Sequence, residues 1–587
     1  MKFLFRGPVA ATAAVLLLSV SNQAQAESAK PELIQPGISL SGNYLSARIA
    51  DTDLDSANAT TFYRSAMALD PEDVVLKQRA FQAFMANGDF DDAVDLAQIL
   101  GKVDQLPELA SIVIAANHVR SKAWSAAGNT LDVNWRSAVN RLVAGILRGW
   151  ALAGDGKTEE ALALVDELKG PAWFDLFVQY HGGLIALNGG NSDDGIRRLQ
   201  IAFNNKDGGR GANNTYLRVV QSLTKAFQDA GRTDQAKELA NIALNLQPQN
   251  PVIRRLHKDT MAGKAPEARV NSPQLGAAEI FFNIGTAINR DGGAEFAKVY
   301  LHLANTLAPG DDSILIQLAE LYDQQRKIVR ANTLFEQVSE KSSLHRIARM
   351  EVAINLDELG EKDKAKEIFQ ALLESDPDDI GAYLTYGSVL ARHENYLGVI
   401  PVLQQMIDRV EKPERRHWSL FYRQGIAYER TKQWPKAEAA FKKALELFPN
   451  QPSVLNYLGY SWVDMGINLN EGLDLIRKAV DLRPNDGYMV DSLGWAYYRL
   501  GRFEDAVIDL ERAVSLRPGD PTINDHLGDA YWRAGRKLEA TFQWRHAHAL
   551  DPPTEKEARA IEDKLENGLP DKPSTIAKPE EKKPNNG

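Results

Sequence analysis

The chain has 587 residues, of which 44% are hydrophobic and 25% are charged, and its formal net charge is −10. The hydrophobic share is enough for a packed core. The acidic balance lacks the basic face that nucleic-acid binding requires, so we expect no nucleic-acid partner. The sequence contains no cysteine, which excludes disulfides and a lipid carried on a cysteine.

The first 26 residues have the pattern of a secretory signal peptide. Lys2 and Arg6 give a positive start, residues 9–20 are mostly apolar or small, and Ala24-Gln25-Ala26 provides a cleavage site. We expect residues 1–26 to be removed, residues 27–39 to begin the mature chain, and the protein to be exported to a bacterial periplasm. A retained signal anchor is the alternative. No later stretch reaches the roughly 18 apolar residues of a membrane-spanning helix, so we expect neither a span nor a lipid anchor after cleavage.

From residue 40 to residue 248, small residues and proline recur at intervals that fit pairs of short helices. The most regular segment contains Gly231, Ala236, Ala243 and Pro248, and the earlier copies are weaker. Residues 249–277 come next, and their polar run GKAPEARVNSP predicts a connector. The alternative is a degenerate repeat that packs without a break.

The clearest repeat lies between Asp491 and Pro552, where one helical hairpin is written twice with a spacing of 34 residues. The matching pairs are Leu493 and Leu527, Gly494 and Gly528, Tyr497 and Tyr531, Gly501 and Gly535, and Ala506 and Ala540. Gly494 and Ala506 should lie where the two helices of a hairpin cross, since only small side chains let the backbones approach. Gly501 should end the first helix in the left-handed conformation.

This spacing resembles the tetratricopeptide repeat, a helix–turn–helix unit of about 34 residues. The resemblance implies an all-α fold, an α-solenoid of about fourteen repeats in two arrays, at residues 40–248 and 278–552. Residues 553–567 should form a capping helix, which solenoids need to cover the last face. Residues 568–587 are rich in proline and charge and should be disordered.

One segment resembles a phosphate-binding loop, since residues 151–158 read ALAGDGKT. A loop of that kind follows a β-strand and opens a helix, whereas residues 142–153 have helical spacing. We therefore interpret Gly156 as a repeat turn and Lys157 as the start of the next helix. The ten histidines do not cluster, and no metal or nucleophile motif occurs. The sequence predicts no catalytic site, no cofactor and no metal.

In this repeat family the first helix of each hairpin lines the concave side, so its positions that are not used for packing should face a groove. In the last four units these positions mix aromatic rings with charges of both signs: Tyr422, Glu429, Arg430, Tyr460, Asp464, Tyr488, Asp491, Trp495, Tyr498, Arg499, Asp525, Asp529, Trp532 and Arg533. Because Tyr, Trp and Arg often dominate binding energies, we predict that this groove binds a protein or peptide. The alternative is that Trp495 and Trp532 fill gaps between repeats.

Some members of the family bind an acidic carboxyl terminus through lysine and asparagine side chains. Asp491, Trp495, Asp525 and Asp529 stand at those places here, so we do not expect that specificity. The run from Asn456 to Val507 resembles the C-terminal repeats of large bacterial envelope proteins of this family, including adaptors that hold a carboxyl-terminal processing protease and its substrates. The sequence thus favours a non-catalytic periplasmic scaffold. The alternatives are envelope assembly or polysaccharide export, an enzyme that carries repeats, and a spacer, and self-association stays open.

Overall fold

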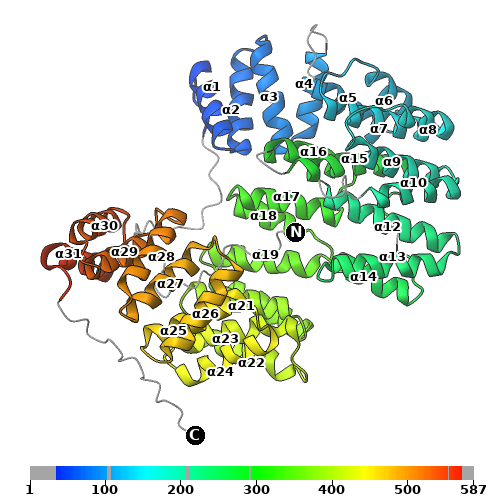
Figure 1. Ribbon diagram of the computed structural model, residues 1–587. Helices are drawn as coiled ribbons and strands as arrows, with labels where there is room; N and C mark the ends of the chain where they lie inside the picture. The colour runs from blue at the N-terminus through cyan, green and yellow to red at the C-terminus, as the bar shows by residue number, and fades with distance from the viewer. Residues whose placement is uncertain are drawn as a thin grey trace. The chain divides into compact units, whose positions relative to one another are not determined.

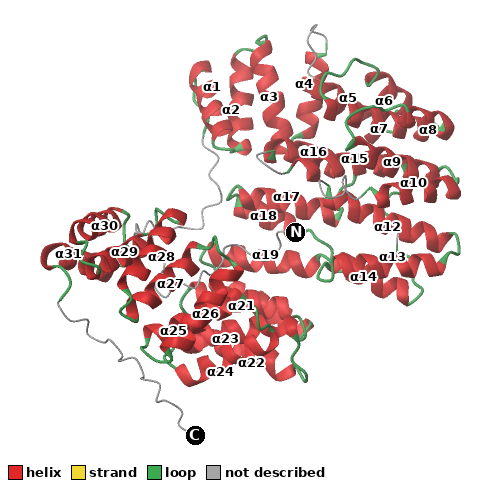
Figure 2. Ribbon diagram, in the orientation of Figure 1, coloured by secondary structure: helices red, strands yellow, loops and turns green. Residues whose placement is uncertain are grey.

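The computed structural model describes residues 35–101, 108–205, 212–266, 268–289, 293–552 and 554–570. These residues form helices joined by turns, with no β-strand among them, which confirms the all-α fold (Figure 2). The predicted signal peptide and the predicted tail from residue 571 onward lie outside the described residues. Within the described ranges, no helix combines the length and the apolar character that crossing a membrane requires.

Contacts divide the described chain into two compact units: the N-terminal unit, which ends at Ile368, and the C-terminal unit, which begins at Phe369. The boundary falls inside α20 (Lys362–Ser375). The helices that precede it are α1 (Leu40–Thr52), α2 (Ser56–Leu69), α3 (Val74–Asn87), α4 (Phe90–Leu100), α5 (Glu108–Arg120), α6 (Trp124–Thr130), α7 (Ala138–Gly154), α8 (Thr158–Asp166), α9 (Phe174–Asn188), α10 (Ser192–Asn204), α12 (Asn213–Asp229), α13 (Thr233–Leu246), α14 (Pro251–Met261), α15 (Pro273–Ile288), α16 (Ala294–Leu307), α17 (Asp312–Gln324), α18 (Ile328–Phe335) and α19 (His345–Glu358) (Figure 1).

Successive helices of the N-terminal unit pack as hairpins, and the pair α7 and α8 shows how they are joined. α7 ends at Gly154, Gly156 adopts a φ of +78°, and α8 begins at Thr158. Glycine takes this left-handed conformation without a steric penalty. The segment that resembles a phosphate-binding loop is therefore a turn between two helices, as interpreted from the sequence.

Helices α15 and α16 lie against the first helices of the preceding hairpins. α15 packs against α7, α9 and α12, while α16 packs against α3 and α5 (Figure 1). Their buried side chains, among them Ile280, Phe281 and Leu301, join the same hydrophobic core as the helices before them. The face formed by the first helices of the N-terminal unit is thus covered by helices of the same chain.

The predicted connector at residues 249–277 does not coincide with the boundary between the units. Residues 251–261 form α14, which packs on α13, and α15 begins at Pro273. The hydrophobic core continues beyond this segment to Leu321, because α15 and α16 bury their apolar faces against the earlier helices. The chain therefore passes through residues 249–277 without leaving the N-terminal unit.

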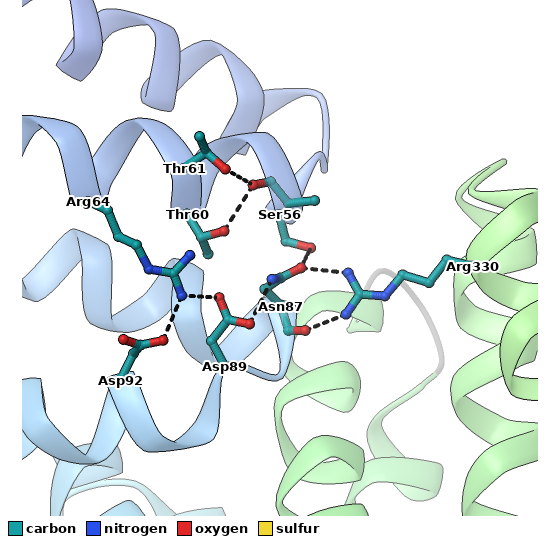
Figure 3. A network of polar contacts seen from close by, with 9 residues as sticks. Ser56, Thr60, Thr61, Arg64, Asn87, Asp89, Asp92 and Arg330 are labelled. Carbon is teal, nitrogen blue, oxygen red and sulfur yellow. Dashed lines mark hydrogen bonds and ion pairs between the residues drawn. The ribbon is translucent and has the colours of Figure 1, made fainter. Parts of the chain in front are cut away.

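A set of polar contacts ties α18 to the beginning of the N-terminal unit (Figure 3). Arg330 donates a hydrogen bond of 2.5 Å to Asn87 Oδ1, and it also donates to the Asn87 carbonyl oxygen. Its guanidinium lies 4.3 Å from the centre of the Tyr322 ring. Lys327 Nζ lies 3.2 Å from Asp55 Oδ2. Asn87 and Arg330 are 243 positions apart, so these contacts join the two ends of the unit.

The C-terminal unit continues the pattern of hairpins. A short 3-10 turn at Arg415–His417 precedes α23. The helices after the boundary are α21 (Ile380–Arg392), α22 (Tyr396–Arg409), α23 (Trp418–Arg430), α24 (Trp434–Leu447), α25 (Pro452–Asp464), α26 (Leu469–Leu482), α27 (Gly487–Arg499), α28 (Phe503–Leu516), α29 (Pro521–Arg533), α30 (Lys537–Ala549) and α31 (Glu555–Asn567). α31 packs on α30 and buries Ile561.

Small residues set the closeness of the helix crossings in these hairpins. A Cβ atom on Gly494 would lie 2.6 Å from Leu510 Cγ and 3.2 Å from the Ala506 carbonyl oxygen. A Cβ atom on Gly459 would lie 2.6 Å from the carbonyl oxygen of Gly472, which is backbone and cannot rotate away. The repeated glycines of the sequence therefore mark places where two backbones touch.

Candidate protein-binding groove

A directed chain of hydrogen bonds crosses from α7 to α15 in the N-terminal unit. The Trp150 indole N–H donates to His181 Nδ1 at 3.0 Å, and His181 Nε2 lies 3.1 Å from Asn283 Oδ1. Because an indole can only donate, Nδ1 accepts and Nε2 carries the proton. Asn283 then donates to Glu279 Oε1 at 2.9 Å. Burial lowers the pKa of His181 to about 3, which keeps the ring neutral.

Glu279 also anchors a buried cluster of charges. Tyr180 donates to its Oε1 at 3.1 Å, and Arg218 Nη1 lies 3.4 Å from its Oε2. Glu279 and Arg218 are each 5% exposed. Arg218 also lies 3.6 Å from Asp311, whose other oxygen pairs with Arg269 at 3.1 Å. These contacts fix α15 in place, so this face of the N-terminal unit already holds a helix of the protein itself.

In the C-terminal unit, by contrast, the first helices of the hairpins surround a cavity of about 360 Å³. α23 contributes Arg430, α25 contributes Tyr460 and Asp464, α27 contributes Trp495, and α29 contributes Asp525. The remaining lining residues are Pro521, Thr522, His526, Pro552, Glu557 and Ile561. The structure thus brings together, at one cavity, side chains that the repeat pattern placed on four successive helices.

Trp495 stands in a stack of rings beside the cavity. Its ring centroid lies 4.6 Å from that of Tyr498 and 4.1 Å from that of His526, with 10° and 17° between the ring planes. His526 Nδ1 lies 2.9 Å from Asp491 Oδ1. Burial alone would lower the pKa of His526, but the Asp491 carboxylate and its neighbours outweigh burial and raise it. Trp495, Tyr498 and Asp491 therefore form one rigid wall.

The wall continues toward α31 through two carboxylates. Lys564 Nζ lies 2.8 Å from Asp525 Oδ2 and 2.8 Å from Asp529 Oδ1. The Trp544 indole N–H donates to Asp529 at 3.0 Å. Burial raises the pKa of Asp529 to about 6, although the Lys564 ammonium opposes the rise. Asp529 is 6% exposed, so it supports the wall from inside while Asp525 faces the cavity.

Tyr422 and Tyr488 lie outside the cavity lining. Tyr422 is 8% exposed, and its ring centroid lies 6.1 Å from that of Phe441 and 6.0 Å from that of Tyr457. Tyr488 lies under the guanidinium of Arg517, 4.6 Å from its ring centre. Both rings are used to pack one helix against another.

Three further predicted residues hold the ends of first helices to their neighbours. Arg499 donates to the Asp464 carbonyl oxygen at 2.9 Å, which satisfies an open carbonyl at the end of α25. Arg533 donates to the Pro570 carbonyl oxygen at 2.7 Å. The Trp532 ring packs 5.3 Å from that of Trp544. For Trp532 this is the gap-filling alternative, whereas Trp495 both packs and lines the cavity.

Reasoning from the sequence missed His526, Glu557 and Ile561 as lining residues. His526 comes directly after Asp525, and the matching position in the preceding repeat is Ser492, so no repeated pattern pointed to it. Glu557 and Ile561 lie on α31, which the sequence predicts only as a cap. The folded chain places the first turns of α31 beside the cavity.

The chemistry of the cavity suits binding. In the described part of the chain, no group of three or more His, Asp and Glu side chains is arranged to hold a metal ion. The Asp491–His526 pair has the composition of an acid–base pair, but the His526 ring is stacked flat on Trp495 and is 13% exposed. What remains accessible is a mixture of charges and aromatic edges, which recognises a partner by charge and contact.

Comparisons with known proteins agree with the repeat pattern. Family models described as "Tetratricopeptide repeat" match residues 316–380 and 418–451, and one described as "TPR repeat" matches residues 494–535. Among curated proteins, the TPR repeat-containing protein PA4667 of Pseudomonas aeruginosa is 25% identical over 196 residues, which cover 33% of this chain and 32% of that protein. The similarity thus spans about a third of that relative.

Several solved structures are also similar. A tetratricopeptide repeat protein from Parabacteroides merdae is 16% identical, with 43% of this chain and 97% of that chain covered and a TM-score of 0.35. The Cut9–Hcn1 structure of the APC/C is 14% identical, with 90% and 96% covered and a TM-score of 0.36. MamA MSR-1 is 23% identical, with 29% and 94% covered and a TM-score of 0.25.

The matched segments fall on helical hairpins of the structure. Residues 418–451 contain the pair α23 and α24, and residues 494–535 run from α27 into α29. Close glycine crossings and left-handed turns recur in these hairpins at the spacing of the repeat. The chain is a tetratricopeptide repeat protein.

Proposed function

We propose that this protein is a non-catalytic scaffold that binds a protein partner at the cavity of its C-terminal unit. The observation that carries the proposal is the convergence of Arg430, Tyr460, Trp495 and Asp525 from four successive first helices on one cavity. Tetratricopeptide repeats generally mediate contacts between proteins. Aromatic and arginine side chains in partly desolvated sites are those that contribute most to such contacts.

The N-terminal sequence supports a place of action. Residues 1–26 have the pattern of a signal peptide, so we propose export to a bacterial periplasm. The resemblance of residues 456–507 to envelope adaptors of carboxyl-terminal processing proteases supports a narrower role, in which the scaffold links such a protease to its substrates. Envelope assembly or polysaccharide export is the alternative role, and the identity of the bound partner separates the two.

A photo-crosslinking amino acid in place of Tyr460 tests the site directly in cells. We expect it to form one defined crosslinked product, because Tyr460 lines the cavity. The matched control places the same amino acid at Phe542, which is 60% exposed on α30 and does not line the cavity. Mass spectrometry of the product identifies a processing protease, a substrate or an assembly component. A crosslinker that gives no product at Tyr460 and at Thr522 would contradict the proposal.

Substitution of the stacked rings gives a second, quantitative test. Trp495→Ala and Tyr498→Ala should each weaken capture of the identified partner by about 1–3 kcal/mol, as aromatic anchors do. Phe542→Ala should leave capture unchanged. Circular dichroism must show that the variants stay helical. If they unfold, the rings serve only packing and the groove assignment is wrong.

A further inference from the structure

The cavity of the C-terminal unit carries more carboxylates than cations. Asp464, Asp525 and Glu557 supply three carboxylates to the lining, while Arg430 supplies one guanidinium. Arg430 lies 3.5 Å from the Glu429 carboxylate, so its charge already has a counter-charge. The field inside the cavity is therefore negative, and it repels an acidic segment while it attracts a basic one.

Lys564 shows that this wall holds an alkylammonium group at close range. Its Nζ lies within 2.8 Å of both Asp525 and Asp529, and the side chain is 16% exposed. Burial opposes the charged form of Lys564, but the two carboxylates outweigh burial and raise its pKa. A cation that is removed from water remains charged only where its counter-charges compensate the lost hydration. The wall provides that compensation for the protein's own lysine.

The carboxylates nearer the mouth of the cavity have remaining capacity for a second cation. Asp464 is 56% exposed, and its ion pair with Arg499 spans 3.4 Å, at the weak end of such contacts. A carboxylate offers about four acceptor positions, and one cation occupies only some of them. Tyr460 adds an aromatic ring, which also attracts cations. The indole N–H of Trp495 has no acceptor among the described residues and is available to a carbonyl oxygen of a bound segment.

We propose that the cavity accepts a lysine or arginine side chain from a segment of the partner, with Asp464, Asp525 and Glu557 as its counter-charges. The inference rests on the proposed function and adds the chemistry of the partner to it. It also accounts for the mismatch with the lysine and asparagine clamp of other family members, because carboxylates here stand where that clamp has basic and amide groups. A segment that ends in acidic side chains does not fit.

Peptide binding to the full chain tests the charge preference. The probe is a fluorescein-labelled, acetylated peptide of five Ala-Lys repeats, and its counterpart has five Ala-Glu repeats. Fluorescence anisotropy at physiological ionic strength should show saturable binding of the lysine peptide and no binding of the glutamate peptide. Equal binding of both peptides, or no binding of the lysine peptide at millimolar protein, overturns the inference.

Matched variants separate this cavity from the general acidity of the chain. The double variant Asp464→Asn with Glu557→Gln should weaken binding of the lysine peptide by about tenfold, because two counter-charges are lost. The control double variant, Asp474→Asn with Glu562→Gln, removes the same charge from residues that are 74% and 56% exposed and do not line the cavity. It should bind as the parent does. Equal weakening by both double variants overturns the inference.

The outcomes also distinguish this inference from the function on which it rests. If crosslinking at Tyr460 captures a partner whose binding is unaffected by the Asp464 and Glu557 variants, the scaffold function stands and the charge preference falls. If crosslinking captures nothing while the lysine peptide binds in a way that depends on Asp464, the cavity has the stated preference and the proposed scaffold function falls.

Discussion

The two units of this protein use the same hairpin repeat but treat its inner face in opposite ways. In the N-terminal unit, α15 and α16 cover the first helices, and a buried polar chain from Trp150 to Glu279 fixes them. In the C-terminal unit, the first helices keep a cavity of about 360 Å³. The repeat therefore supplies a surface, and the later helices of each unit decide whether that surface is filled or left for a partner.

The difference extends to the charges. Arg218 and Glu279 in the N-terminal unit are each 5% exposed and face each other. Asp464 in the C-terminal unit keeps 56% of its side-chain surface exposed. Buried pairs are costly to break, whereas exposed charges contribute little to stability and remain available to a ligand. We accordingly expect substitutions on the inner face to affect folding in the first unit and binding in the second.

The largest expected effect comes from the filled face. Glu279→Ala removes the acceptor of Tyr180 and Asn283 and leaves Arg218 buried without its nearest carboxylate. The free energy of unfolding of the N-terminal unit should fall by about 3–5 kcal/mol. Denaturant unfolding measures the loss, and hydrogen exchange followed by mass spectrometry locates it.

The control for Glu279→Ala is Asp91→Ala, which breaks an ion pair with Arg120 whose carboxylate is 81% exposed. It should change stability by less than about 1 kcal/mol. If Glu279→Ala is equally mild, α15 is not held by this network, and the contrast between a filled and an open inner face loses its basis.

A middle-sized effect belongs to the C-terminal unit. Gly459→Ala places a Cβ atom 2.6 Å from the Gly472 carbonyl oxygen, so the crossing of α25 and α26 must open. We expect a loss of about 2 kcal/mol, with faster hydrogen exchange confined to the C-terminal unit. Gly519→Ala is the control, because nothing lies within 4 Å of its added Cβ atom. Exchange that also rises throughout the N-terminal unit would show that the two units unfold together.

The smallest effect is a pH dependence that belongs to the N-terminal unit. The folded pKa of His181 is lowered to about 3 by burial, below the unfolded value of about 6.5. Its contribution to stability is therefore complete above pH 6.5 and is lost as the pH falls, because the unfolded ring takes up the proton first. Between pH 7.5 and 5.5 this loss amounts to about 1.4 kcal/mol.

His181→Gln tests that pH dependence, because glutamine can accept from Trp150 and donate to Asn283 but cannot titrate. Its stability should fall less than that of the parent by the same amount between the two pH values. The difference isolates this ring, since the other titrating groups are common to both proteins. Identical pH dependence in parent and variant would show that His181 is not held neutral by the fold.

Much of the local architecture could be predicted from residue types and spacing. The pairing of Gly494 with Ala506 predicts a close crossing, and a Cβ atom on Gly494 would indeed lie 3.2 Å from the Ala506 carbonyl oxygen. The same spacing predicts the left-handed conformation at Gly501, whose φ is +74°, and a turn at Gly156. These features depend on neighbours within one hairpin, which a repeating sequence pattern records directly.

The candidate site was only partly accessible to that reasoning. Tyr460, Trp495 and Asp525 lie at the cavity because their helix positions face inward in successive repeats. Tyr422 was assigned by the same rule but packs against Phe441, since that position faces the neighbouring helix pair. The rule gives the face of a helix, and it does not say how far the next hairpin covers it.

The sequence by itself determined the helical hairpins, their turns and the small residues at their crossings, because each is a contact between segments a few tens of residues apart. Only the tertiary structure decided that α15 fills one inner face and that α31 borders the other. Those arrangements depend on contacts such as His181 with Asn283, 102 residues apart, and Asn87 with Arg330, 243 apart. Such contacts arise from small rotations that accumulate over many hairpins, and no single repeat encodes their sum.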